Sequence, residues 1–330
     1  MPSSERLGPL RLHERLAARG AASTTAVHLG WLVETARLVA VKRLHPLHVS
    51  DAAGVERVSE EARLAMDVDH PNVVPMLGVL RRPGEMVAAM DYVPSASLAE
   101  IAKAARGGLE PRVATAIAAG VLRGLHAVHE VRASVVPRVV SSDRVLVGED
   151  GHARVLHFDV SGSRSARAAL DDLPYAAPEQ LLGKGVDVRR DVFAVSVVLW
   201  QTLTGRSLFG APTVHGVLQK IVEGDVPAPS TFAPGVDRKL DSIVLRGLAR
   251  DAHARFESAS AMSCELEATA CASADEVARL LAEMDLACIR WRSSLADTVR
   301  RRESASRASK RTAVFAPDVE LGGNFVSMDD

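Results

Sequence analysis

The sequence predicts an α+β fold of two lobes, in which a small five-stranded antiparallel sheet with one helix precedes a larger and mainly helical lobe. Two observations indicate this division. The first ninety residues hold short runs that alternate in hydrophobicity or are rich in β-branched residues, whereas apolar residues recur at helical spacing from about Leu98 onward. The length of 330 residues also corresponds to roughly two typical domains.

Five strands and one helix are expected in the small lobe. Apolar residues at helical spacing over 51–67 place Val55, Ala62 and Ala65 on one stripe and predict the helix. The turn Arg82-Pro83-Gly84 separates the last two strands. The expected strands are residues 11–18, 26–33, 37–44, 73–79 and 86–92.

Helices and one hairpin are expected in the large lobe. Pro111 suits the first position of a helix, and apolar residues follow it at helical spacing as far as Leu125. The turn at residues 148–151 lies between two short apolar runs and predicts a β-hairpin over 145–156. Further helices are expected at residues 192–203 and 240–248.

A final helix is expected within residues 270–299, because Ser273 and Glu276 have the spacing of a capping box. Its apolar residues recur at intervals of four and three, so the stripe either packs back on the large lobe or joins two chains in a homodimer. They are Val277, Leu281, Met284, Cys288, Trp291 and Leu295. Residues 300–330 are first basic and then acidic, and we expect them to be a disordered tail.

The composition excludes several classes of protein. Forty Lys and Arg residues nearly balance 41 Asp and Glu residues, and the net charge of −1 argues against nucleic-acid binding by global electrostatics. The longest apolar stretch, residues 192–205, is shorter than the ~18 residues that a membrane span needs. Three cysteines confined to the last quarter fit neither a disulfide framework nor a zinc site. Because a signal peptide is also lacking, we expect a cytoplasmic protein.

Several short motifs occur along the chain in the order in which one family carries them. They are Val39-Ala40-Val41-Lys42, Glu61 nine residues before His70-Pro71-Asn72, Gly148-Glu149-Asp150-Gly151, Ala177-Pro178-Glu179, Asp191-Val192-Phe193, Leu203-Thr204-Gly205-Arg206 and Arg255. On these residues the chain resembles the bacterial Ser/Thr protein kinases. The resemblance covers about residues 11–269, with a small lobe over 11–92 and a large lobe over 93–269, and it implies the protein-kinase-like fold.

The resemblance implies a nucleotide site between the lobes. In the family, a lysine placed like Lys42 holds the α- and β-phosphates, and a glutamate placed like Glu61 fixes that lysine by a charge-assisted hydrogen bond. The phosphate loop falls on residues 20–27, where Gly20 is the family glycine that is retained. The candidate nucleotide contacts are Gly20, Val27, Ala40, Lys42, Glu61, Met90, Asp91, Val93 and Leu146. No cofactor is required in this hypothesis, and ATP or ADP binds weakly without metal if it binds at all.

Three further matches imply a conserved scaffold of the family. A glutamate placed like Glu179 forms a buried ion pair with an arginine placed like Arg255, and breaking such a pair is costly. An aspartate placed like Asp191 opens a buried helix and accepts backbone N–H bonds from the catalytic loop. The resemblance therefore implies that these three residues hold the shape of the large lobe and do no chemistry.

Three positions of the chemical centre depart from the family pattern. The position of the catalytic base is Val139, which accepts no proton. The metal-binding asparagine is replaced by Arg144, whose positive charge repels a metal, and the Mg²⁺-binding aspartate is replaced by His157. The sequence thus predicts no catalytic residue and no metal site.

These departures favour a catalytically inactive or severely impaired kinase homologue, a pseudokinase that is not an enzyme. Such a protein would act in signalling as a regulatory or scaffolding module, with a protein such as an active kinase as its partner. An active kinase could also phosphorylate the basic tail, at Ser304, Ser306, Ser309 or Thr312, although the sequence favours a plain solvated tail.

Two alternatives remain open in the sequence. The first is a weak or unconventional ATP-dependent protein Ser/Thr phosphotransferase in which Asp143, Asp171 or Asp172 supplies a substitute carboxylate. In the second, Lys42 and Arg144 bind nucleotide phosphates without a metal ion, unless Arg144 pairs with a nearby acid and fills the site.

Overall fold

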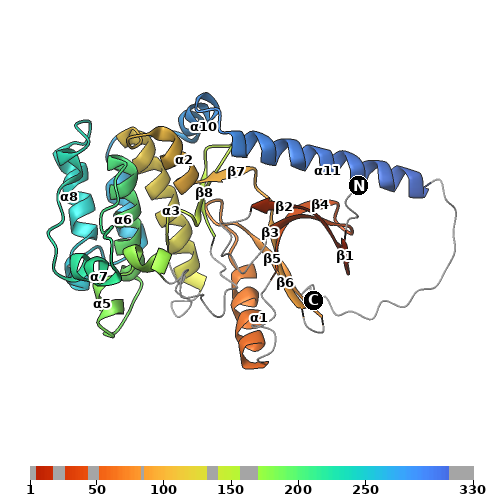
Figure 1. The fold of residues 1–330 in the computed structure, drawn as a ribbon, viewed down its shortest axis with the longest axis horizontal. Coiled ribbons are helices and arrows are strands. Elements are labelled where there is room, and N and C mark those ends of the chain that lie inside the picture. Colours follow the sequence, from red (N-terminus) through yellow and green to blue (C-terminus); the bar gives the residue numbers. More distant parts are fainter. Residues whose placement is uncertain are drawn as a thin grey trace.

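The computed structural model describes residues 5–17, 27–43, 52–82, 85–131, 140–156 and 170–311, without the side chains of 17, 52–54, 57, 58, 61 and 306–311. Figure 1 shows two lobes, a sheet with the helix α1 (Ala52–Met66) and a group of helices beside it. This arrangement confirms the two-lobed α+β fold expected from the sequence.

The small lobe is built on a six-stranded antiparallel sheet with the strand order β1-β2-β3-β4-β6-β5. The strands are β1 (Glu5–Leu7), β2 (Leu10–Ala17), β3 (Val27–Leu32), β4 (Arg37–Arg43), β5 (Met76–Arg82) and β6 (Glu85–Asp91). The expectation of five strands was wrong by one, because β1 folds back over Gly8 and pairs Leu7 with Leu10. A strand of three residues is too short to show alternation in the sequence.

The strand expected at residues 73–79 begins three residues later than predicted. The backbone of the preceding segment pairs with the other lobe instead, since the N–H of Val74 donates to the carbonyl of Val155 at 3.1 Å. The N–H of Val155 in turn donates to the carbonyl of Asn72 at 2.9 Å. This short parallel bridge joins the two lobes next to the strand that leads into the sheet.

Helix α1 covers one face of the sheet with the stripe expected from the sequence. Val55, Ala62 and Ala65 are buried there and pack against a cluster that includes Met86 and Met90. Burial of these apolar side chains contributes a favourable free energy of about 25 cal/mol per Å² of surface removed from water. This burial holds the helix on the sheet.

A second sheet of three short strands lies at the junction of the lobes (Figure 1). Strand β7 (Ser95–Ser97) pairs with β8 (Val145–Gly148), which forms the expected hairpin with β9 (Ala153–Val155). Gly151 turns this hairpin with φ of +74°, and a Cβ there would meet the carbonyl oxygen of Ala274 at 1.9 Å. The turn therefore needs glycine both for its backbone conformation and for its contact with the C-terminal helices.

The large lobe is a helical body around α6 (Arg189–Thr204), which is buried along nearly its whole length. An all-round apolar helix of this kind lies at the centre of a core. The helices around it are α2 (Leu98–Ala105), α3 (Pro111–Val131), α5 (Pro178–Leu181), α7 (Val214–Val222), α8 (Arg238–Gly247) and α9 (Ala259–Glu267), with the 3₁₀ turns η2 (Leu173–Tyr175), η3 (Pro229–Thr231) and η4 (Ala252–Ala254).

Two helices replace the single C-terminal helix that the sequence predicts. The capping box of Ser273 and Glu276 begins α10 (Ala274–Glu283) as expected. The chain then changes direction at Asp285, which takes a φ of +48°. Helix α11 (Ala287–Arg311) follows. The apolar stripe is therefore split, with one part packed on the large lobe and the other on the small lobe. Helix α11 also continues through residues 300–311, so the expected disorder was wrong for that half of the tail, and residues 312–330 lie outside the described residues.

The apolar stripe is largely enclosed by the chain itself. Val277 and Leu281 pack on the large-lobe core, whereas Leu295 packs on the small-lobe sheet and Trp291 is 46% exposed. The homodimer through this stripe stays a prediction.

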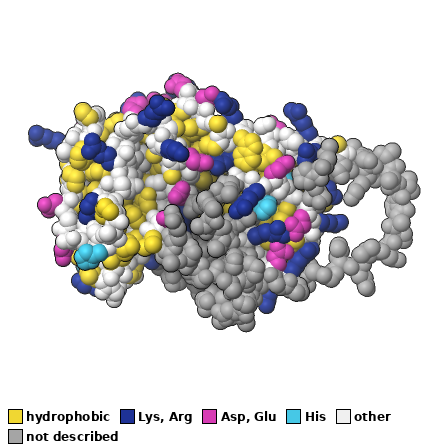
Figure 2. Space-filling model, viewed as in Figure 1, with side chains coloured by type: hydrophobic (Ala, Val, Ile, Leu, Met, Phe, Trp, Pro, Cys, Tyr) yellow, Lys and Arg dark blue, Asp and Glu magenta, His cyan; other side chains and the backbone are white. Residues whose placement is uncertain are grey.

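The visible face of the molecule carries acidic and basic side chains interspersed among small apolar areas (Figure 2). Among the residues that the structure describes, no helix combines the length and the apolar character that crossing a membrane requires.

Candidate functional site

The candidate nucleotide residues of the small lobe lie together on strands β3 and β4. Val27 pairs with Lys42 in the register of these strands, and Leu29 pairs with Ala40. Val41 is fully buried on the opposite face, whereas Ala40 and Lys42 are half-buried. Strand alternation therefore places Ala40 and the lysine on one face of the sheet, as the resemblance implies.

The segment that connects the lobes begins with three candidate residues at the end of β6. Met90 pairs with Ala40 and is buried in the cluster beneath α1. The carboxylate of Asp91 accepts two hydrogen bonds from Arg37, at 2.8 and 2.5 Å. Val93 is half-buried in the connecting segment. The Asp91 carboxylate is therefore held by Arg37 on the neighbouring strand β4.

Leu146 approaches from the large lobe on strand β8. It packs with Leu156 against the cluster that contains Met90. Val27 and Ala40 pack against a different cluster, on the sheet. The structure thus places the candidate adenine contacts on the borders of two separate apolar clusters, both of which include strand residues of the small-lobe sheet.

Several candidate residues lie outside the described residues, and the structure does not test them. They are Gly20, Val139, His157 and the side chain of Glu61. The backbone of Glu61 lies in α1, on the helix predicted for it.

Arg144 is held by an acid of the neighbouring loop. Its Nη2 donates to Oδ2 of Asp172 at 2.9 Å, and 15% of the Arg144 side chain and 9% of the Asp172 side chain remain exposed. The expectation that Arg144 pairs with a nearby acid is confirmed. A guanidinium has five donors and no acceptor, so this position offers charge and hydrogen bonds to an anion but no ligand to a metal.

A hydroxyl network next to Arg144 was not predicted from the sequence. The Tyr175 hydroxyl donates to Oε1 of Gln201 at 3.1 Å and lies 3.3 Å from the hydroxyl of Ser142. Burial raises the pKa of Tyr175, so the phenol keeps its proton at neutral pH. The neighbouring Asp143 carboxylate is exposed.

The ion pair between Glu179 and Arg255 is present as the resemblance implied. Two parallel hydrogen bonds of 2.8 and 2.7 Å join the guanidinium to the carboxylate. The same guanidinium donates from Nε to the carbonyl of Ala249 at 2.7 Å and lies 4.9 Å from the ring centre of Phe193. With Arg255 2% exposed, this pair anchors the first turn of α5 to the core of the large lobe.

Asp191 has a side-chain partner that sequence reasoning missed. The Nε2 of His129, in the last turn of α3, donates to Oδ2 of Asp191 at 2.8 Å. Burial raises the pKa of the Asp191 carboxyl, and the bond from His129 and the charge of Arg190 oppose that rise. The backbone donors expected for Asp191 belong to a loop of which residues 132–139 lie outside the described part. The sequence gives no local signal of this contact, because His129 and Asp191 are 62 residues apart.

Comparison with known families matches residues 15–266 to the protein kinase domain, which is most of the chain. The chain belongs to the protein kinase family.

The protein kinases most similar to it include several bacterial proteins. The chain is 25% identical over 261 residues to Serine/threonine-protein kinase PrkC of Bacillus subtilis, covering 77% of this chain and 40% of that protein. It is 28% identical over 253 residues to Serine/threonine-protein kinase PknL of Mycobacterium tuberculosis, covering 75% and 63%. It is 28% identical over 282 residues to Tyrosine-protein kinase MasK of Myxococcus xanthus, covering 81% and 44%. The chain therefore spans less than two thirds of each of these relatives.

A solved protein kinase domain has the same fold. The crystal structure of the Mycobacterium tuberculosis PknI kinase domain superimposes with a TM-score of 0.63 at 21% identity, covering 81% of this chain and 98% of that one. At this identity the likeness shows the two-lobed fold.

The prediction that the chain is not an enzyme is contradicted by these comparisons. The family is one of enzymes, and the relatives are named as kinases. The prediction gave too much weight to three side chains, because a general base contributes only about 10²–10⁴ to a rate. Phosphate binding and positioning contribute independently of that base.

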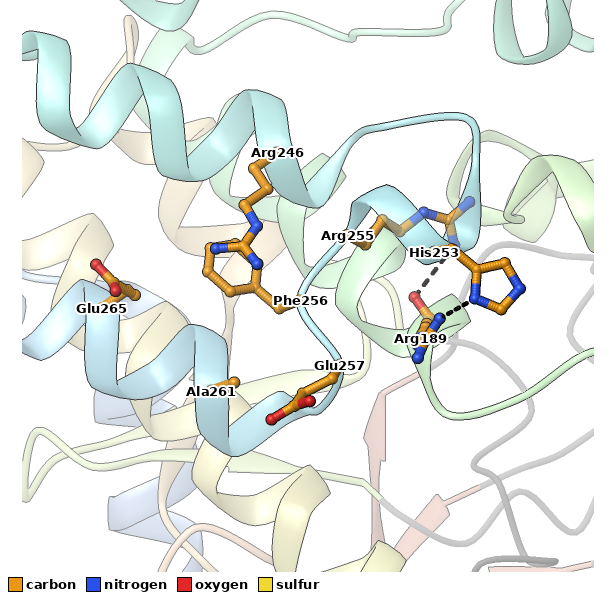
Figure 3. A pocket seen from close by; sticks show the side chains of 8 residues that line it. All are labelled: Arg189, Arg246, His253, Arg255, Phe256, Glu257, Ala261 and Glu265. Atoms are coloured by element: carbon orange, nitrogen blue, oxygen red, sulfur yellow. Dashed lines mark hydrogen bonds between the residues drawn. The ribbon is translucent and has the colours of Figure 1, made fainter.

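One cavity of this protein kinase domain lies within the large lobe, away from the candidate nucleotide residues. It has a volume of about 430 Å³. Figure 3 shows the guanidinium of Arg246 over the ring of Phe256, at 4.1 Å, and Arg189 donating to Nδ1 of His253 at 2.7 Å. The lining residues are Arg189, Arg246, His253, Arg255, Phe256, Glu257, Ala261 and Glu265. Acidic and basic groups share this wall, so it has no single charge preference.

The described part of the kinase domain holds no group of three or more His, Cys, Asp or Glu side chains arranged to bind a metal ion. The residues that would complete the family metal site fall on positions 144 and 157, and the second of these lies outside the description.

Proposed function

We propose that this kinase domain binds ATP between its lobes and transfers the γ-phosphoryl group to a protein Ser or Thr hydroxyl, with a low turnover. The observation that carries the proposal is the placement of Val27, Ala40 and Lys42 on two paired strands, with Leu146 supplied by the large lobe. The family and the names of PrkC and PknL support the reaction class.

Nucleotide phosphates are bound by two cations in this proposal. Lys42 contacts the α- and β-phosphates, and Arg144 exchanges its bond to Asp172 for phosphate oxygens. A guanidinium can bind phosphate through two parallel hydrogen bonds and brings a fixed positive charge without a metal ion. ATP binding is therefore weak and insensitive to the removal of metal.

The transfer step needs an acceptor for one proton. The hydroxyl oxygen of the acceptor attacks the γ-phosphorus, the bond from phosphorus to the β–γ bridging oxygen breaks, and ADP leaves. The hydroxyl proton passes to a carboxylate, for which Asp143 is the candidate because it is exposed beside Ser142 and Tyr175. A valine at position 139 removes the usual base, which lowers the expected rate by about 10²–10⁴.

Phosphate incorporation from γ-labelled ATP tests the activity. The purified chain should label itself or a generic Ser/Thr substrate slowly, and Lys42→Ala should abolish the labelling. Lys103→Ala, at an exposed lysine of α2, is the matched control and should leave the labelling unchanged. Labelling no greater than that of Lys42→Ala would overturn the proposal, whereas an unchanged rate in Asp143→Ala would remove only the assigned base.

A thermal shift with ATP tests the binding mode. The shift should be the same with Mg²⁺ and with EDTA, and Arg144→Ala should lose it. No shift at millimolar ATP would rule out the nucleotide site.

A second role, the binding of a protein partner, is favoured by apolar side chains on the large lobe. Leu182 is 51% exposed after α5, and Val214 is 46% exposed at the start of α7, which contacts α5. Val186 is 41% exposed between these helices. Burial of such side chains contributes to protein association. Leu182→Ser with Val214→Ser should lower phosphorylation of a protein acceptor and leave the ATP-induced thermal shift unchanged.

A further inference from the structure

Helix α11 joins the two lobes from outside the sheet. It leaves the large lobe after α10 and runs along the small-lobe strands β2, β3 and β4 (Figure 1). It touches β7 at the lobe junction and β3 in the sheet. The helix therefore lies against parts of the molecule that a nucleotide between the lobes would also meet.

The first turns of α11 hold the segment that connects the lobes. The Tyr92 hydroxyl donates to the carbonyl of Arg292 at 2.8 Å, and Arg292 donates from Nη1 to the carbonyl of Ser95 at 2.7 Å. Arg292 also makes two bonds of 2.9 Å to the carboxylate of Glu100, at the start of α2. Burial raises the pKa of Tyr92 to about 12, so this phenol stays a donor. Bidentate bonds from a partly buried arginine fix the helix to this segment.

The middle of α11 shares an apolar cluster with the candidate nucleotide residues. Leu295, Ala296 and Val299 are 9%, 0% and 0% exposed and pack with strand residues of the sheet. Val27 and Ala40 pack against the same cluster. The strand residues are Leu16, Leu29, Trp31 and Leu38. The helix thus supports the sheet face that carries two of the candidate adenine contacts.

The far part of the docked helix is held by a buried carboxylate. Glu303 is 5% exposed, and its Oε2 accepts a bond of 2.7 Å from Nη1 of Arg11 on β2. The Nε2 of His13 lies 3.3 Å from Oε1 of the same carboxylate. The helix rises about 1.5 Å per residue, so the contacts from Arg292 to Glu303 span roughly 16 Å. Buried carboxylates need such partners, which makes this contact specific.

We propose that α11 is a detachable outer wall of the nucleotide site, which holds the connecting segment and the Val27–Ala40 face in place and raises the affinity for nucleotide while it is docked. The inference rests on the nucleotide binding proposed above. Glu303 contacts Arg11 and His13 of β2, which are not among the candidate nucleotide residues, so its loss should release the helix without touching those residues.

A charge reversal at Glu303 tests the inference in the full chain. Glu303→Arg places a cation against Arg11 and should weaken ATP binding by about three- to tenfold in calorimetry, with faster hydrogen exchange of α11. Asp297→Arg makes the same change of charge at an exposed site of α11 and should alter neither quantity. The double variant Arg11→Glu with Glu303→Arg should restore both.

The outcomes separate this inference from the proposed function. Faster exchange of α11 in Glu303→Arg with unchanged ATP affinity would overturn the inference and leave nucleotide binding intact. Tighter ATP binding in Glu303→Arg would overturn it as well, because the helix would then exclude nucleotide. An unaltered chain that binds no ATP would overturn the proposed function and the inference together.

Discussion

Two arginine–carboxylate pairs of the large lobe differ in how far the protein encloses them. Arg255 binds Glu179 through two parallel bonds and donates to main-chain carbonyls besides, with its side chain 0% exposed. Arg144 donates to Asp172 at the lobe junction, with 15% of its side chain exposed. Both carboxylates keep 9% of their side chains exposed, so the two pairs differ at the arginine. The enclosed Arg255 serves the scaffold, whereas Arg144 lies at a boundary where an anion could replace the carboxylate.

Removal of the enclosed arginine should have the largest effect on stability. Arg255→Ala leaves the Glu179 carboxylate buried without its partner, which costs about 3–5 kcal/mol of unfolding free energy. Denaturant unfolding measures this loss. Arg238→Ala, at an exposed arginine of α8, should stay within about 0.5 kcal/mol of the unaltered chain. A loss below about 1 kcal/mol in Arg255→Ala would remove the distinction between the two pairs.

Removal of the partner of Asp191 should rank next. His129→Ala takes away the 2.8 Å bond from a fully enclosed carboxylate, which costs about 1–3 kcal/mol. A double-mutant cycle with Asp191→Asn isolates the contact, since the two residues touch and their effects should not add. Additive effects in denaturant unfolding would show that His129 acts by packing alone.

Removal of the boundary arginine should have a smaller effect on stability. Arg144→Ala should cost about 1–2 kcal/mol, because it leaves the buried Asp172 carboxylate without this hydrogen bond, while the Arg144 side chain itself keeps 15% exposure to water. Arg144→Lys keeps the charge but loses the planar fork, so it should preserve stability and weaken the response to ATP. A loss as large as that of Arg255→Ala would place this pair in the scaffold.

The pH dependence should be the mildest effect and should arise in the small lobe. Burial lowers the pKa of His13 from 6.5, with Glu303 and Glu14 opposing and Arg302 adding to the shift. The folded state thus binds this proton less well than the unfolded state, so the contribution to stability is complete above pH 6.5. This contribution to stability declines as the pH falls from 6.5 toward the lowered pKa of His13 in the folded state. Thermal unfolding between pH 7.5 and 5.5 should show this decline, and His13→Gln should make it smaller.

The scaffold was more predictable from the sequence than the contacts that support it. Glu179, Asp191 and Arg255 occur in short motifs whose positions alone imply their surroundings, and α1 follows from a regular apolar stripe. The bond of His129 to Asp191 joins residues 62 positions apart and leaves no pattern. Three-residue strands such as β1 and β7 are too short for periodicity.

The C-terminal region shows why composition alone misled the prediction. Residues 300–311 are rich in Arg and Ser, which favoured disorder in the sequence. The single acid among them, Glu303, is the residue that the small lobe binds, and Val299 is fully buried one turn earlier. The break between the two helices lies at Asp285, whose backbone is left-handed. An aspartate tolerates this conformation, but its presence in a sequence does not predict it. Tertiary contacts therefore decided both features.

The position of α11 also constrains the order in which the protein can be assembled during its synthesis. Arg11 and Glu303 meet across 292 residues of sequence. Contacts of such separation form late, because closing the intervening chain costs entropy before it gives any contact. The ribosome delivers the strands of the small lobe first. The apolar sheet face that α11 covers, including Trp31 and Leu38, therefore stays open to solvent and to chaperones until α11 has emerged.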